Sequence, residues 1–386
     1  MQLERNRRGR PQCGARPTPS SFHPGSGRRA LALLSLAIAL CSAAGPGEPA
    51  YHPIQTVKVS PERQIFDYAS ADSRNRRIYL AHGEEVVVLD ADSNAVVGRI
   101  PAPRFDPTYG IGLFDRKTPY QGVHHVAIAP DLGRGFTANG RSGTSTIFDL
   151  KTLKPVGEVK LTGKDPNVVV YDQATKRVFA FNVDTHNATV FDGRSGKVLK
   201  TVPLSGEPAF AAGDGAGQVF VNLKDLNSVQ RINARTLVAD ALWPVGCKGP
   251  QNESMAIDPA HGRLFVGCRP DNRRLRFAPG PAPDRIMQVL DTRSGRVVAS
   301  APIGGNPDEA AFDPGTGLVF SSNGEGSVTV IKERTPDRYE VIQTLATEPG
   351  AARMAVDQKT HKLFLPNNDP EPSGHGPNFR VLVFGR

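Results

Sequence analysis

The 386-residue sequence predicts an all-β fold, and three observations carry that prediction. Short runs of alternating β-branched and aromatic residues recur along the chain, and no helical pattern of about 10–15 residues separates them. Glycine (39) and proline (33) are abundant, which favours many turns and disfavours long helical bundles. The runs recur at an interval slightly over 40 residues, which indicates a repeat architecture.

Seven copies of one strand motif define the repeat. Their starting positions differ by 57, 43, 41, 45, 55 and 44 residues. Each copy is the second of a group of short apolar runs. One run precedes it, a third follows it, and a fourth follows in six of the seven copies. Four short strands at this period are the signature of a β-propeller blade, so we expect a seven-bladed β-propeller of four-stranded antiparallel blades. The copies are RIYLAH from Arg77, RGFTAN from Arg134, RVFAFN from Arg177, QVFVNL from Gln218, RLFVGC from Arg263, LVFSSN from Leu318 and KLFLPN from Lys362.

The two ends of the repeat region predict how the ring closes. The seventh copy stops at Arg386 after its third strand, and an unassigned strand over 54–59 precedes the first blade. Pairing this strand with the last three completes the seventh blade and removes exposed sheet edges. The propeller is therefore expected over 54–386, as a monomer.

The first 44 residues have the features of an export signal. They contain seven arginines and one acidic residue, then an apolar run from Ala30 to Cys41 and small residues up to Ala44. We expect a signal peptide over 1–44 and a linker over 45–53, and hence a periplasmic or secreted protein. Cys41 leaves a lipoprotein open as the alternative, and the Arg28-Arg29 pair leaves the export route open.

Removing the signal changes what the charge implies. The whole chain has a net charge of +9, which invites a nucleic-acid partner, but six of these charges belong to residues 1–44. The remaining +3 makes nucleic acid an unlikely ligand.

A repeated acid-and-hydroxyl pair is expected to be structural. Asp or Asn ends the third strand in five blades, and Ser or Thr follows three residues later. An aspartate at the start of a tight turn caps backbone N–H groups, which a hairpin requires. The pairs are Asp90/Ser93, Asp149/Thr152, Asp192/Ser195, Asn233/Thr236 and Asp291/Ser294.

The motifs together resemble a known family. The strand RVFAFN, the run VVVLD and the turn pattern D-x-x-S-G-[KR]-V-[VL] are similar to YVTN-repeat, YncE-like propellers of exported bacterial proteins. The resemblance covers roughly 54–386, although every copy departs from the literal Tyr-Val-Thr-Asn strand. It implies an exported WD40-like seven-bladed propeller with a binding role and no shared enzymatic activity. No Trp-Asp pair of the WD40 type is present.

Four insertions are expected on one face of the ring. Connections from a fourth strand to the next first strand, and from a second to a third, emerge together, and all the long segments are of these kinds. Long loops grouped on a rigid scaffold usually carry the binding site. The segments are 101–122, 244–252, 269–286 and 366–379.

Cys247 and Cys268 lie on the same long-loop face. In an oxidising compartment, and with no third cysteine after residue 44, the pair indicates a disulfide. Two thiols, or half of a metal site, remain the alternatives.

Polar residues recur where the innermost strands begin. One aligned position holds Asp67, His124, Asn167, Glu253 and Asp308, with alanine in two blades, and the next position includes Arg353. We name these six polar residues as a candidate ligand site at the channel mouth. His124, Glu253 and Asp308 are candidate ligands for Ca²⁺, Mn²⁺ or Zn²⁺. The alternative is an ordinary wet, polar channel mouth.

The 269–286 insertion carries a second candidate site. Arg273, Arg274, Arg276 and Phe277 together suit a phosphate, a sugar acid or single-stranded nucleic acid, with a solvated loop as the alternative.

The sequence therefore favours an exported binding or scaffold protein over an enzyme. The expected partner is an envelope protein, a glycan or a small anionic ligand. One alternative is a metal-dependent hydrolase, similar to sugar lactonases, at the channel mouth. The other is an accessory propeller subunit of a periplasmic quinoprotein-type redox system. No P-loop, G-x-S-x-G, H-E-x-x-H or CxxC motif supports a particular catalytic residue.

Overall fold

Strands form almost all the regular structure of the computed structural model. It describes residues 50–60, 66–103, 122–248, 251–269, 285–368 and 378–386. The predicted signal peptide over 1–44, most of the linker and much of the long insertions (104–121, 249–250, 270–284 and 369–377) lie outside the described residues. Within the described part, no helix has the length and apolar character needed to cross a bilayer.

The strands form seven four-stranded antiparallel sheets, numbered here as blades in chain order. Blade 1 is β2–β5 (Phe66–Asp72, Arg77–His82, Glu85–Asp90, Val96–Pro101), and blade 2 is β6–β9 (Val123–Ala129, Arg134–Asn139, Thr144–Asp149, Pro155–Lys160). Blade 3 is β10–β13 (Pro166–Asp172, Arg177–Asn182, Asn187–Asp192, Val198–Pro203), and blade 4 is β14–β17 (Pro208–Gly213, Gln218–Leu223, Ser228–Asn233, Val238–Pro244). Blade 5 is β18–β21 (Gln251–Asp258, Arg263–Arg269, Ile286–Asp291, Val297–Pro302), and blade 6 is β22–β25 (Pro307–Asp313, Leu318–Asn323, Ser327–Thr335, Arg338–Ala346). Blade 7 is β26–β28 (Ala355–Val356, Leu363–Asn368, Phe379–Gly385) with β1 (His52–Ser60).

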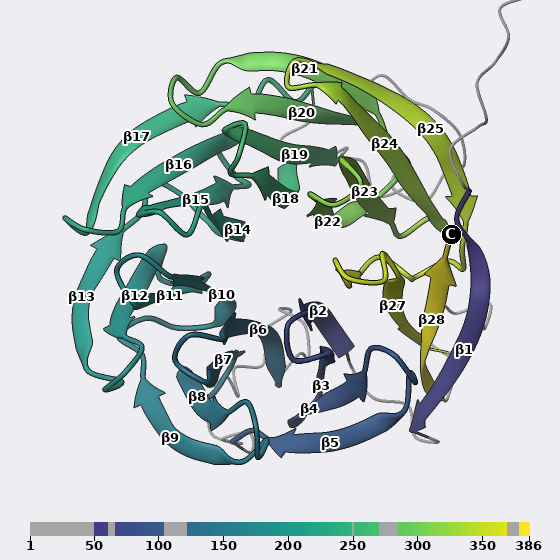
Figure 1. Cartoon of the computed structure of the whole chain (residues 1–386). Helices are drawn as coiled ribbons and strands as arrows, with labels where there is room; N and C mark the ends of the chain where they lie inside the picture. The colour runs from purple at the N-terminus through teal and green to yellow at the C-terminus, as the bar shows by residue number, and fades with distance from the viewer. Residues whose placement is uncertain (1–49, 61–65, 104–121, 249–250, 270–284, 369–377) are drawn as a thin grey trace, which may run out of the picture. The chain divides into compact units, whose positions relative to one another are not determined.

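The blades stand in a ring, with first strands innermost and fourth strands at the perimeter (Figure 1). β1 pairs antiparallel with β28, so the N-terminal strand completes the last blade. Both the seven-bladed β-propeller and its predicted closure are confirmed.

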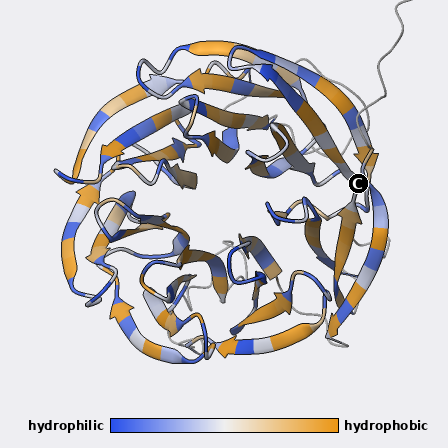
Figure 2. Ribbon diagram, viewed as in Figure 1, coloured by the Kyte–Doolittle hydropathy of each residue, from blue (hydrophilic) through white to orange (hydrophobic). Residues whose placement is uncertain are grey.

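The core lies between neighbouring blades. In β11 five of six side chains are buried, whereas in β13 only Val202 is. Figure 2 shows the same difference, with hydrophilic and hydrophobic residues alternating along the perimeter strands. Two-sided burial explains why the second strands read as continuous apolar runs.

The repeated aspartates cap turns, as predicted. Asp192 Oδ1 accepts hydrogen bonds from the Ser195 N–H and hydroxyl, both at 2.8 Å. Asp90, Asp149 and Asp291 make the same two bonds, and Asn233 accepts from the Thr236 N–H.

Side chains fill the ring axis below its long-loop end. Tyr68 of blade 1 and Phe210 of blade 4 come from non-adjacent blades, yet their ring centroids are 5.0 Å apart. The His125 ring packs edge-on against both of them. The long-loop end of the axis therefore has an aromatic floor, formed by Tyr68, His125 and Phe210.

Candidate functional site

The polar positions at the start of the inner strands coincide with backbone irregularities. The ladder between first and second strand shifts register there in six blades. Such bulges re-aim side chains at the rim of a sheet. They bring residues from both aligned positions to the same end of the axis.

Six side chains form one chain of charged contacts, called here the mouth cluster. Its members are Asp67, His124, Glu253, Arg269, Asp308 and Arg353. It joins blades 1, 2, 5, 6 and 7 and therefore ties most of the ring together.

Arg353 is the link between blades 6, 7 and 1. Its Nε lies 2.8 Å from Asp67 Oδ1, and its Nη1 contacts Asp308 Oδ2. The guanidinium carbon lies 4.6 Å from the centre of the Tyr68 ring, so the cation rests on the aromatic floor.

The cluster continues in both directions from Arg353. Arg269 Nη1 lies 3.1 Å from Asp308 Oδ1, and its Nη2 lies 3.2 Å from Glu253 Oε2. On the other side, His124 Nδ1 lies 2.7 Å from Asp67 Oδ2. The carboxylates of Asp67, Asp308 and Glu253 thus alternate with the guanidiniums of Arg353 and Arg269 around the mouth.

Burial and pairing set the charge states of the cluster and its floor. Arg353 and the His124 hydrogen bond hold the pKa of Asp67 below its usual range, despite the opposing effect of burial. Burial lowers the pKa of His125 to about 4, so this imidazole is neutral at pH 7. Burial also raises the pKa of Glu309, which accepts the Met354 N–H at 2.7 Å.

The structure brings five of the six predicted channel-mouth residues into this cluster. Asn167 is the second residue of β10 and is partly buried, and its neutral amide is outside the ion pairs found among the described residues. The proposed metal set does not converge, because His124 bonds to Asp67 whereas Glu253 and Asp308 meet at Arg269. Metal binding by His124, Glu253 and Asp308 stays a prediction.

Sequence reasoning missed two parts of the site. The sequence places Arg269 at the start of the 269–286 insertion, but it ends β19 and its side chain reaches the mouth. Its place directly after Cys268, at the end of a strand motif, is the signal in the sequence. The aromatic floor was missed because alternation along a regular strand sends adjacent residues to opposite sides. At a bulge this rule fails.

The predicted disulfide is present between Cys247 and Cys268, whose Cα atoms are 5.5 Å apart. It joins the β17–β18 connection to the end of β19, immediately before Arg269. The second candidate site, Arg273, Arg274, Arg276 and Phe277, lies outside the described residues.

The fold and site define the class of this protein as a seven-bladed β-propeller with a charged cluster over a filled axis. No family model matches the chain, and no curated protein matches it. Among solved structures, it is similar to the WD40 repeats of RRP9, with a TM-score of 0.65 and 9% identity over 86% of this chain and 97% of that chain. At this identity the likeness shows the fold, and the site must be judged on its own residues.

Proposed function

We propose that the protein is an exported binding protein that recognises its ligand with the long-loop face. The observation that carries the proposal is the mouth cluster, which lies on an aromatic floor at the end of the axis from which the long insertions emerge. A rigid floor surrounded by loops is the usual arrangement of a binding site on a repeat scaffold. The basic, apolar leader over 1–44 supports export.

The charges of the cluster favour one class of ligand. Three carboxylates (Asp67, Glu253, Asp308) face two guanidiniums (Arg269, Arg353), so a small anion would meet more negative than positive charge. A ligand with many hydroxyl groups can donate to the carboxylates and accept from the guanidiniums. We therefore propose a glycan as the ligand.

The same contacts favour binding over metal-dependent hydrolysis. Both oxygens of Asp308 and the Oε2 atom of Glu253 face an arginine, so a cation would compete with these ion pairs. A lactonase would require these ion pairs to open.

A thermal-shift screen with defined probes tests the proposal. The probes are maltotriose, chitotriose and digalacturonate, with inorganic phosphate and a twelve-nucleotide DNA as charge controls. We expect an oligosaccharide to raise the Tm of the purified protein by several degrees at saturation. A variant in which a short Gly-Ser turn replaces 270–284 should respond less.

Two results would contradict the proposal. One is no response to any oligosaccharide, with binding of phosphate or DNA instead. The other is an unchanged response in the shortened variant and in Glu253→Gln.

A further inference from the structure

Two residues break the repeat at one place on the face opposite the mouth cluster. On this face, each first strand ends near an aspartate. In blades 1, 3, 6 and 7, the residue three positions after the aspartate has a short side chain that donates a hydrogen bond to its carboxylate. These caps are Asn75 on Asp72, Thr175 on Asp172, Thr316 on Asp313 and Thr360 on Asp357. In blade 5 the residue three after Asp258 is His261, a much larger side chain with a second nitrogen.

The second break is Glu333 in blade 6. Its backbone N–H donates to Gly317 O, and the equivalent bond identifies its counterparts in blades 1 to 5. Those counterparts are small or apolar, or a threonine: Ala91, Leu150, Gly193, Ala234 and Thr292. A carboxylate in such a position is costly unless it has a partner. The Glu333 side chain is only 6% exposed.

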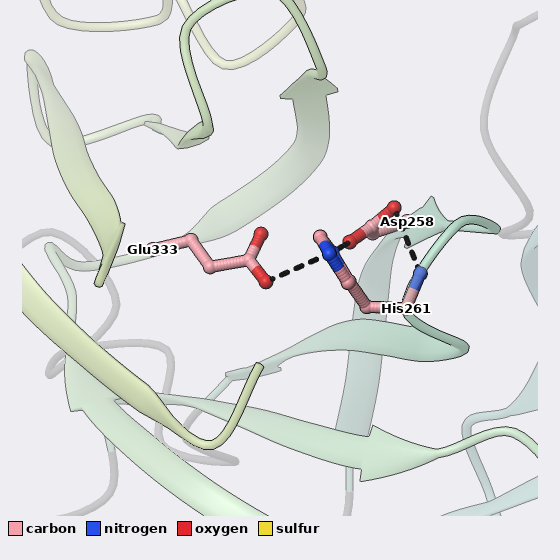
Figure 3. A group of neighbouring side chains, drawn as sticks. All are labelled: Asp258, His261 and Glu333. Atoms are coloured by element: carbon pink, nitrogen blue, oxygen red, sulfur yellow. Dashed lines mark hydrogen bonds and ion pairs between the residues drawn. The ribbon is translucent and has the colours of Figure 1, made fainter. Parts of the chain in front are cut away.

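The two breaks meet across the seam between blades 5 and 6 (Figure 3). His261 Nδ1 lies 2.5 Å from Asp258 Oδ2 and 3.3 Å from Glu333 Oε1. One donor atom from each of the three residues lies within 4.8 Å of the others. Tetrahedral donors that each lie about 2.0–2.2 Å from one ion are about 3.3–3.6 Å apart, so side-chain shifts of about 1 Å would complete the geometry.

Hydrogen bonding leaves Glu333 incompletely satisfied. Nδ1 carries at most one hydrogen, and the shorter contact directs it to Asp258. Glu333 Oε1 then accepts no hydrogen bond from the described residues, although it points toward His261 and is almost fully buried.

The neighbouring cations already have other partners. Arg263 lies between Asp291 and Asp337, at 3.0 and 2.8 Å, and Lys332 Nζ donates to Thr316 O at 2.7 Å. Two carboxylates facing one imidazole form a negative, oxygen-rich pocket. The pocket is open to solvent on the side of His261, whose side chain is 52% exposed.

We propose that Asp258, His261 and Glu333 bind a divalent transition-metal ion, Zn²⁺ by preference, that fastens blade 5 to blade 6. One imidazole nitrogen and two carboxylate oxygens are a Zn²⁺ ligand set, and the exposed side leaves a fourth position for water. The site is independent of the proposed function, because it lies on the opposite face and uses none of the mouth cluster.

Calorimetric titration of the purified, tag-free protein with Zn²⁺ after chelator treatment tests the proposal. We expect one equivalent to bind and to raise the Tm. His261→Thr installs the cap that three other blades use, and Glu333→Ala installs the residue found in blades 1 and 4, so both variants should fold. Each should bind Zn²⁺ at least about tenfold more weakly.

His361→Asn is the matched control. His361 Nδ1 lies 2.7 Å from Asp313 Oδ2 in a two-residue pair on the same face, and asparagine tolerates its φ of 59°. This variant should bind Zn²⁺ as the wild type does. Co²⁺ loaded in place of Zn²⁺ should give visible absorption bands that His261→Thr removes.

Either of two results would overturn the site. One is that the wild type binds none of Zn²⁺, Co²⁺ or Mn²⁺. The other is that both variants bind Zn²⁺ with wild-type affinity.

Discussion

Aspartate occupies two repeated positions in the blade, and its partners differ between them. At the end of third strands it caps its own turn, which the sequence pattern predicts because donor and acceptor are three residues apart. At the end of first strands it can also reach the next blade, as Asp357 does to Arg76. That partner is distant in sequence, so only the folded ring reveals it.

Asp357→Asn should destabilise the protein, because Arg76 donates to both of its carboxylate oxygens at 2.6 and 2.7 Å across the seam between blades 7 and 1. We expect a loss of about 2 kcal/mol in the free energy of unfolding, measured by urea denaturation. Asp92→Asn removes the exposed partner of the same arginine and should cost less. Equal losses in the two variants would contradict this assignment.

At the level of elements, the repeat pattern predicted strand order and closure, and the two cysteines after residue 44 predicted the disulfide. It could not predict the mouth cluster as a connected network, because each contact depends on bulges and on blades that are distant along the chain. Residues such as Asp67 and Glu253 were found by alignment of the repeats, whereas Arg269 was not, since it belongs to a second strand.

The disulfide should stabilise the entrance to blade 5. Replacing both cysteines by serine opens a loop closed over a separation of 21 residues, for which we expect a loss of about 3 kcal/mol. The two single variants should lose as much as the double variant. A wild-type denaturation midpoint in the double variant would contradict this role.

Closure by β1 predicts a sharp difference between two truncations. A chain beginning at residue 50 retains the β1–β28 pairing and should unfold cooperatively at the wild-type midpoint. A chain beginning at residue 61 exposes the edge of β28 and should aggregate or unfold below about 37 °C. Circular dichroism melting and size-exclusion chromatography distinguish the two, and identical behaviour would argue against closure.

For the whole molecule, the sequence predicted the ring and the face that carries the long connections, but not the filled axis or the seam between blades 5 and 6. Apolar periodicity specifies which strands pair and pack. The meeting of Tyr68 with Phe210, or of His261 with Glu333, follows from the curvature of the closed ring.

Ionisation in the folded ring makes stability depend on pH in opposing directions. Burial lowers the pKa of His125 to about 4, so its contribution is present above the ordinary 6.5 and is lost as the pH falls. The pKa of Asp67 and Asp357 is held below the ordinary 3.8, so their contribution is present above that pH and is lost as the pH falls. Burial raises the pKa of Glu309 above 4.5, so its contribution is present below that pH and is lost as the pH rises. Urea denaturation at about pH 3, 5 and 7 measures the free energy of unfolding on the acidic side and on the neutral side of this range.

Glu309→Gln is the control for the loss of stability that Glu309 causes as the pH rises. It removes the titrating group and keeps an oxygen that can accept the Met354 N–H. The stability at pH 7 relative to pH 5 should be higher in this variant than in the wild type. The same difference between the two pH values in both proteins would contradict this role of Glu309.

The central claim is that the long-loop face binds the ligand, and calorimetric titration tests it most directly. The titrant is the oligosaccharide that gives the largest thermal shift, and the proteins are the wild type, Glu253→Gln and His361→Asn. We predict that Glu253→Gln, within the mouth cluster, weakens binding at least about tenfold, and that His361→Asn, on the opposite face, binds as the wild type does. Loss of binding in His361→Asn with full binding in Glu253→Gln would contradict the account.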